Sequence, residues 1–137
     1  MTVKVIMLPL PEDLYVRLEQ TARATRQSLT DVLVRSVRTG SPPDWSEAPA
    51  TFHADLAALD RLDDDALWRV ARSQRSEADA AHLQALLEKN ADDALTDAEQ
   101  VELDKQVAEA DRFMLRKAHA AALLQWRGHP VPPFNRL

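Results

Sequence analysis

The pattern of residues 3–40 constrains the fold most, because it predicts one short strand, then two amphipathic helices, and no second strand follows. Apolar side chains alternate at Ile6, Leu8 and Leu10, which is the period of a half-buried strand. A single strand without a neighbour is not stable in water. We therefore predict that this strand, beginning near Val3, pairs with its copy in a second molecule. The expected unit is a homodimer, with larger assemblies left open.

Two helices are predicted after the strand. Pro11 suits a first helical position, where no amide hydrogen is needed, and Glu12 and Asp13 complement the positive end of the helix dipole. Ser28 is the predicted cap of the second helix, and Gly40 ends it. The apolar residues of the strand and helices are predicted to form the dimer core: Ile6, Leu8, Leu10, Leu14, Leu18, Leu29, Val32 and Leu33.

This order of elements resembles the ribbon-helix-helix family of small dimeric DNA-binding repressors and antitoxins. The resemblance is carried by the period-two strand, the helix start at residues 11–14, the turn at residues 25–28 and the apolar face of the second helix. It covers about the first 40 residues. It implies that the outward face of the ribbon enters the DNA major groove and that the start of the second helix grips a phosphate. The residues this implies as DNA contacts are Lys4, Val5, Met7, Pro9, Arg26, Gln27, Ser28 and Thr30.

Charge is distributed unevenly along the chain. Residues 1–40 carry six basic and four acidic side chains, a net charge of +2, whereas residues 41–137 carry 11 basic and 18 acidic ones, a net charge of −7. A basic head with an acidic body is expected if only the head meets phosphates. The alternative is an ordinary solvated surface with an uneven distribution.

Residues 41–51 are predicted to be a stiff linker, and the domain boundary is placed there. Pro42, Pro43 and Pro49 prevent a continuous helix in this segment. Trp45 is expected to pack on a neighbouring helix.

Residues 52–137 show helical patterns only. Asp63-Asp64-Asp65 is read as a helix cap rather than a magnesium site, because no second acidic motif accompanies it. Ser76 caps the next segment, and a capping box at Thr96 opens a long helix that reaches Arg127, about 45 Å at 1.5 Å per residue. The densest basic group is Arg112, Arg116 and Lys117, with Arg127 further along. Contact with RNA or an acidic partner is one interpretation of it, and a solvated helix face with i, i+4 pairs is the favoured one. The predicted fold class is mainly α: a ribbon-helix-helix head, a linker and a helical region with one long helix.

The sequence predicts neither an enzyme nor a cofactor. It has no cysteine and only two glycines, so it lacks a thiol nucleophile and a glycine-rich phosphate loop. The four histidines are scattered and no zinc-protease spacing occurs, so no metal site is predicted. The N-terminus does not resemble a signal peptide and no segment is long and apolar enough to cross a membrane, which predicts a cytoplasmic protein.

Two functions remain open from the sequence. The first is a dimeric DNA-binding regulator of the antitoxin type, whose acidic helical region binds and neutralises a partner protein such as a toxin or nuclease. The residues predicted to touch that partner are Trp68, Met114 and Trp126. The second is an adaptor that uses the head only to dimerise. It is favoured by Val5, Met7 and Pro9, because the predicted DNA-facing side of the strand has no hydrogen-bond donor.

Overall fold

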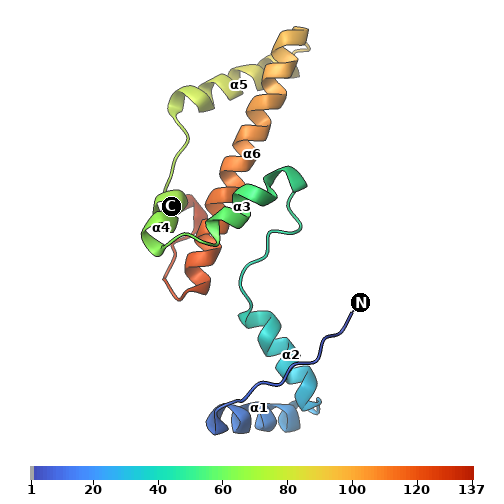
Figure 1. Ribbon diagram of the computed structural model, residues 1–137. Helices are drawn as coiled ribbons and strands as arrows, with labels where there is room; N and C mark the ends of the chain where they lie inside the picture. Colours follow the sequence, from blue (N-terminus) through green and yellow to red (C-terminus); the bar gives the residue numbers. More distant parts are fainter. Residues whose placement is uncertain (1) are drawn as a thin grey trace. The chain divides into compact units, whose positions relative to one another are not determined.

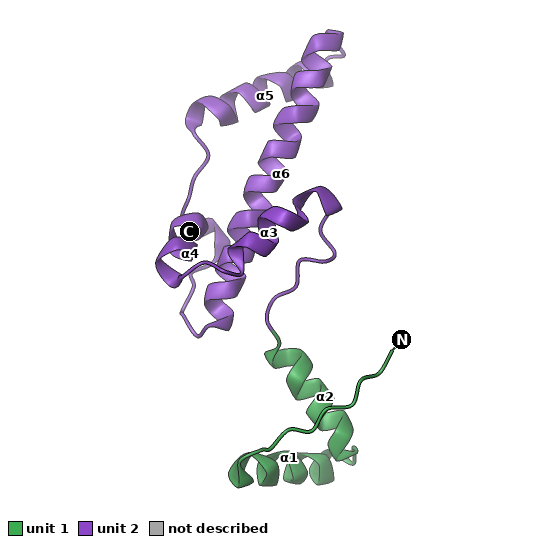
Figure 2. Ribbon diagram, viewed as in Figure 1, with its two compact units in different colours: residues 1–41 green, residues 42–137 purple. Residues whose placement is uncertain are grey.

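The computed structural model describes residues 2–137 and is built from helices joined by irregular segments (Figure 1). The chain divides into two compact units, one ending at Ser41 and the other spanning residues 42–137 (Figure 2). The elements are α1 (Glu12–Thr25), α2 (Leu29–Gly40), η1 (Ala50–Phe52), α3 (His53–Leu59), α4 (Asp64–Ala71), α5 (Glu77–Ala91), α6 (Asp97–Trp126) and η2 (Phe134–Arg136), where η marks a short 3-10 helix.

The predicted N-terminal strand is not formed. Residues 3–10 have no regular secondary structure, and residues 2–137 contain no strand at all. A strand is held by hydrogen bonds to a neighbouring strand, and the described part of this chain supplies none. The prediction of a ribbon-helix-helix fold is therefore wrong, because the ribbon is absent. The coarser prediction of a mainly α protein is confirmed.

The first unit is a pair of helices joined by a tight turn. Arg26 adopts a left-handed backbone conformation, with φ 56°, that ends α1. The Ser28 hydroxyl accepts a hydrogen bond of 3.0 Å from the backbone amide of Asp31, which confirms the predicted cap of α2. Among residues 2–41, only Ala22 of α1 and Val32 of α2 are buried. Two buried side chains make a very small core.

The core of the second unit forms where α3 and α4 pack against the C-terminal half of α6, as Figure 1 shows. Its largest fully buried side chains are Leu59, Leu67 and Leu124, one from each of these three helices. The long helix is confirmed: α6 has 30 residues and begins with the Thr96 capping box. The remaining buried core residues are Leu56, Ala71, Ala120 and Leu123.

The other helix caps predicted in this unit are also confirmed. The Asp63 carboxylate accepts from the amide of Ala66 at 2.8 Å, and the Ser76 hydroxyl accepts from the amide of Asp79 at 3.1 Å. The segment after Ser41 is not a free spacer, because Trp45 is partly buried against the core and its Nε1 donates to Asp60 Oδ2 at 2.9 Å. Trp45 therefore packs on the helices as predicted.

Candidate functional site

The N-terminal apolar segment, residues 3–8, is the most exposed apolar stretch of the first unit. Val5 and Met7 are 92% and 97% exposed, and Ile6 and Leu8, which were predicted to face the core, are 79% and 63% exposed. Both sides of the segment are therefore uncovered. Lys4, Val5, Met7 and Pro9 are exposed as predicted for DNA contacts, but they do not share one face of a strand.

Most of the other predicted dimer-core residues are only partly covered in the helix pair. Val32 is buried, whereas Leu14 of α1 is 37% exposed. The rest are half-buried: Leu10, Leu18, Leu29 and Leu33. The helix pair therefore leaves part of its apolar side chains exposed.

The start of α2 groups the second set of predicted DNA contacts. Arg26, Ser28 and Thr30 are exposed, and Gln27 is half-buried. The first amides of a helix have no partner within that helix, and the helix dipole adds positive potential there. This end of α2, which begins three residues after Arg26, is of the kind that binds anions such as phosphate.

The three predicted partner contacts do not form one site. Trp68 is half-buried, with the guanidinium carbon of Arg72 4.4 Å from the centre of its ring and the His129 ring at 6.2 Å. Met114 and Trp126 are 58% and 50% exposed. They lie twelve residues apart on α6, about 18 Å along the helix axis. A single small contact patch cannot include both.

Two aspartates hold distant parts of the second unit together, which sequence reasoning did not predict. Asp60 lies 2.7 Å from Nε2 of the buried His119 and also binds Trp45. Asp64 accepts from Arg127 at 2.9 Å through Oδ1 and lies 2.7 Å from His129 through Oδ2. In the Asp60–His119, Asp64–Arg127 and Asp64–His129 contacts, the two partners are separated by 59 to 65 positions in the sequence. Trp45 and Asp60 are separated by 15 positions. No local sequence signal indicates such pairs. We interpret them as contacts that stabilise the fold.

The Arg127 hydrogen bond, followed by the one from His129, holds the pKa of Asp64 below its usual value of 3.8. A carboxyl whose pKa is lowered by folding stabilises the fold above its unfolded pKa, and this contribution is lost as the pH falls through the folded pKa. We therefore expect the second unit to lose thermal stability on acidification below about pH 4. In the Asp64→Asn variant the slope of melting temperature against pH in this range should be shallower. The melting temperatures are measured by circular dichroism. An unchanged slope would show that the Asp64 contacts do not make stability depend on pH.

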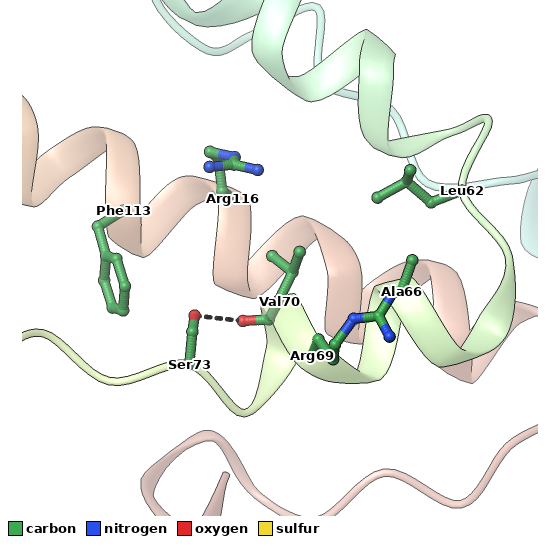
Figure 3. Close-up of a pocket in the computed structure, with 7 residues that line it drawn as sticks. All are labelled: Leu62, Ala66, Arg69, Val70, Ser73, Phe113 and Arg116. Atoms are coloured by element: carbon green, nitrogen blue, oxygen red, sulfur yellow. Dashed lines mark hydrogen bonds between the residues drawn. The ribbon is translucent and has the colours of Figure 1, made fainter.

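The groove between α4 and α6 carries two arginines without ionic partners. It has a volume of about 380 Å³. Figure 3 shows Arg116 extending from α6 and Arg69 from α4, with Val70 drawn between them. Neither guanidinium has a carboxylate within 4.0 Å in residues 2–137, and the buried Nε of Arg116 has no hydrogen-bond partner. The remaining lining residues are Leu62, Ala66, Ser73 and Phe113.

The prediction of a solvated basic face on α6 is wrong for Lys117, whereas Arg112 is exposed and Arg116 is half-buried. Arg112 pairs with Asp55 of α3, and Lys117 is only 5% exposed and donates to the backbone carbonyl of Ser73 at 3.0 Å. Arg116 lines the groove instead. Arg112 and Arg116 are four residues apart and share one face of the helix, whereas Lys117 follows Arg116 directly and lies on a different side.

Further features limit the chemistry of the described residues. Asp63 caps α4 while Asp64 binds Arg127 and His129, so the acidic run is divided between structural roles. Among residues 2–137, no group of three or more histidine, aspartate or glutamate side chains is placed to hold a metal ion. No helix in the described part of the chain combines the length and apolar character needed to cross a membrane.

Comparison with known proteins gives no relative: no protein-family model, no curated protein and no solved structure matches this chain.

Proposed function

We propose that the protein is a cytoplasmic regulator of the antitoxin type. It self-associates and contacts DNA through residues 2–41, and it binds a partner protein through residues 52–137. The observation that carries this proposal is the N-terminal unit, which combines a net positive charge with apolar side chains left uncovered. With the ribbon absent, the resemblance to DNA-binding regulators is limited to the helix pair and its sequence pattern.

Self-association is supported by how little of the first unit is buried. Its only buried side chains in the described structure are Ala22 and Val32, a core too small to stabilise a unit of this size alone. Contiguous exposed apolar surface in a folded protein is typical of an interaction site. A second copy of the unit presents the same apolar residues and would cover them symmetrically. The exposed apolar residues available for this contact are Val3, Val5, Ile6, Met7, Leu8, Leu14, Tyr15, Val16, Val34 and Val37.

DNA contact is supported by charge and by the start of α2. The first 40 residues carry a net charge of +2, which self-association would double. Contacts to phosphates supply most of the sequence-independent affinity for DNA, and helix N-termini are suited to such contacts. Arg26 and Thr30 are exposed at the α2 start in the described unit.

Partner binding is supported by the opposite charge of the rest of the chain. Residues 41–137 carry a net charge of −7. An acidic helical surface is complementary to a protein with a basic cleft, as proteins that act on nucleic acids often have. A toxin or nuclease of this kind is the proposed partner.

The DNA contact is tested with the double variant Arg26→Ala/Ser28→Ala. We expect its affinity for a duplex from the upstream region of its gene to fall at least tenfold, because a cation and a helix cap are both lost. The matched control is Ser36→Ala/Arg38→Ala, which makes the same change in charge at the other end of α2. Fluorescence anisotropy gives the affinities, and circular dichroism verifies that both variants are folded. Equal affinity in the wild type and both variants would contradict the proposed contact.

The second candidate function is an adaptor that self-associates without binding DNA. The exposed Val5, Met7 and Pro9 favour it, because none of these side chains can donate a hydrogen bond to a base. In that case the full-length protein would self-associate but would not bind DNA at physiological salt. It would then be purified from its host together with a specific protein.

A further inference from the structure

The groove between α4 and α6 combines an apolar floor with two guanidiniums that have no carboxylate within 4.0 Å among residues 2–137. Its apolar lining comes from Leu62, Ala66, Val70 and Phe113. Arg69 comes from α4 and Arg116 from α6, and Val70 lies between them in the view of Figure 3. This unit is acidic overall, so a groove with two unpaired guanidiniums carries a charge opposite in sign to that of the whole unit.

Arg116 is the more unusual of the two arginines. Its side chain is half-buried, and the buried Nε has no hydrogen-bond partner. A buried donor without a partner is destabilising, and a hydrogen bond to a charged acceptor is the strongest way to satisfy it. Three other basic residues of this unit do have partners: Arg112 pairs with Asp55, Arg127 with Asp64, and Lys117 with a backbone carbonyl.

We propose that this groove binds an acidic segment of a partner protein. One apolar side chain of the segment lies on the floor, and carboxylates on either side of it pair with Arg69 and Arg116. A guanidinium can bind a carboxylate through two parallel hydrogen bonds, which fixes the orientation of the bound segment. The volume of about 380 Å³ is sufficient for one such side chain with its neighbouring backbone.

The charge of the whole unit favours a short acidic peptide over a nucleic acid. A net charge of −7 on residues 41–137 repels a long polyanion, whereas a few carboxylates placed directly on two arginines are attracted at short range. The groove lining has aliphatic side chains and one phenylalanine, and it lacks the row of aromatic rings on which successive bases stack.

The test is an NMR titration of the full-length, nitrogen-15-labelled protein with the peptide acetyl-Glu-Glu-Leu-Glu-Glu-amide. We expect shifts at the backbone amides of Val70, Ser73 and Arg116. The Arg69→Gln/Arg116→Gln variant should bind the peptide at least tenfold more weakly. The control Lys105→Gln/Arg136→Gln removes the same charge from exposed positions outside the groove lining and should change the affinity less than twofold.

Two further peptides separate the charge from the apolar contact. Replacing the glutamates by glutamine, or the leucine by serine, should each weaken binding at least fivefold. The proposal is overturned if the groove amides do not shift, if the groove variant binds as well as the control, or if either altered peptide binds as well as the original. A uridine tetranucleotide that shifts the groove amides more strongly than the peptide would also overturn it, in favour of a nucleic acid.

The inference rests on the proposed role of residues 52–137 as a partner-binding region and adds that the partner, besides its basic cleft, carries an acidic segment. DNA binding is tested on the other unit with other residues. If the protein binds the peptide but not DNA, this inference stands and the proposed DNA contact fails. If the protein binds DNA but not the peptide, only this inference fails.

Discussion

Replacing Ile6 and Leu8 together by aspartate is expected to dissociate the protein into monomers. These side chains are 79% and 63% exposed in a single chain, and the proposed self-association would bury them. Burying a large aliphatic side chain contributes about 1.5–3 kcal/mol, and a symmetric contact loses four of them together. We therefore expect the dissociation constant to rise by at least about 100-fold. Sedimentation equilibrium over a range of concentrations measures this directly.

The matched control carries the same two charges in the other unit. Val101 and Met114 are 71% and 58% exposed on α6, so the Val101→Asp/Met114→Asp variant adds two acidic groups to an exposed helix surface. It should self-associate like the wild type. If both double variants dissociate equally, net charge rather than the N-terminal segment sets the assembly. A wild-type protein that stays monomeric throughout would remove the basis of the proposed function.

Leu124→Ala is expected to lower the free energy of unfolding of the second unit by about 2–5 kcal/mol, because it removes three carbons from a fully enclosed site. Leu124 is 0% exposed and belongs to the core shared by α3, α4 and α6. All three tryptophans, Trp45, Trp68 and Trp126, lie in this unit, so urea unfolding followed by tryptophan fluorescence reports on it selectively.

Met114→Ala is the control for the core variant. Its side chain is 58% exposed on the same helix, and we expect a change within about 0.5 kcal/mol. A loss of comparable size in both variants would mean that the long helix is sensitive along its whole surface. Little effect from Leu124→Ala would contradict the packing of α6 described above.

The features predicted correctly from the sequence are local ones. Ser28, Asp63, Ser76 and Thr96 each cap a helix through an amide three residues ahead, so the signal and the structure lie within one turn. The long α6 was predictable because no proline or glycine interrupts it.

The failures share a physical cause, since each depends on a contact between distant residues. A strand at residues 3–10 needs a neighbour to pair with, and local alternation of apolar residues cannot supply one. Lys117 was predicted on a solvated face, but it is buried because the chain after α4 brings the Ser73 carbonyl to it.

The candidate sites divide in the same way. Arg26 and Ser28 were found from the sequence because a turn and a cap identify the helix start. The Asp60–His119 and Asp64–His129 pairs span 59 and 65 positions, and the groove joins Arg69 to Arg116 from two different helices. Only the packing of α3 and α4 against α6 and the residues that follow it brings these side chains together.

Sequence-dependent DNA binding tests the central claim most directly. A labelled duplex from the upstream region of the gene and a scrambled duplex of equal composition are titrated with full-length protein at low and physiological salt, and fluorescence anisotropy is recorded. We predict tighter binding to the upstream duplex and weaker binding to both as salt rises, because phosphate contacts release counterions. Equal and feeble binding to both duplexes would contradict a DNA-binding regulator.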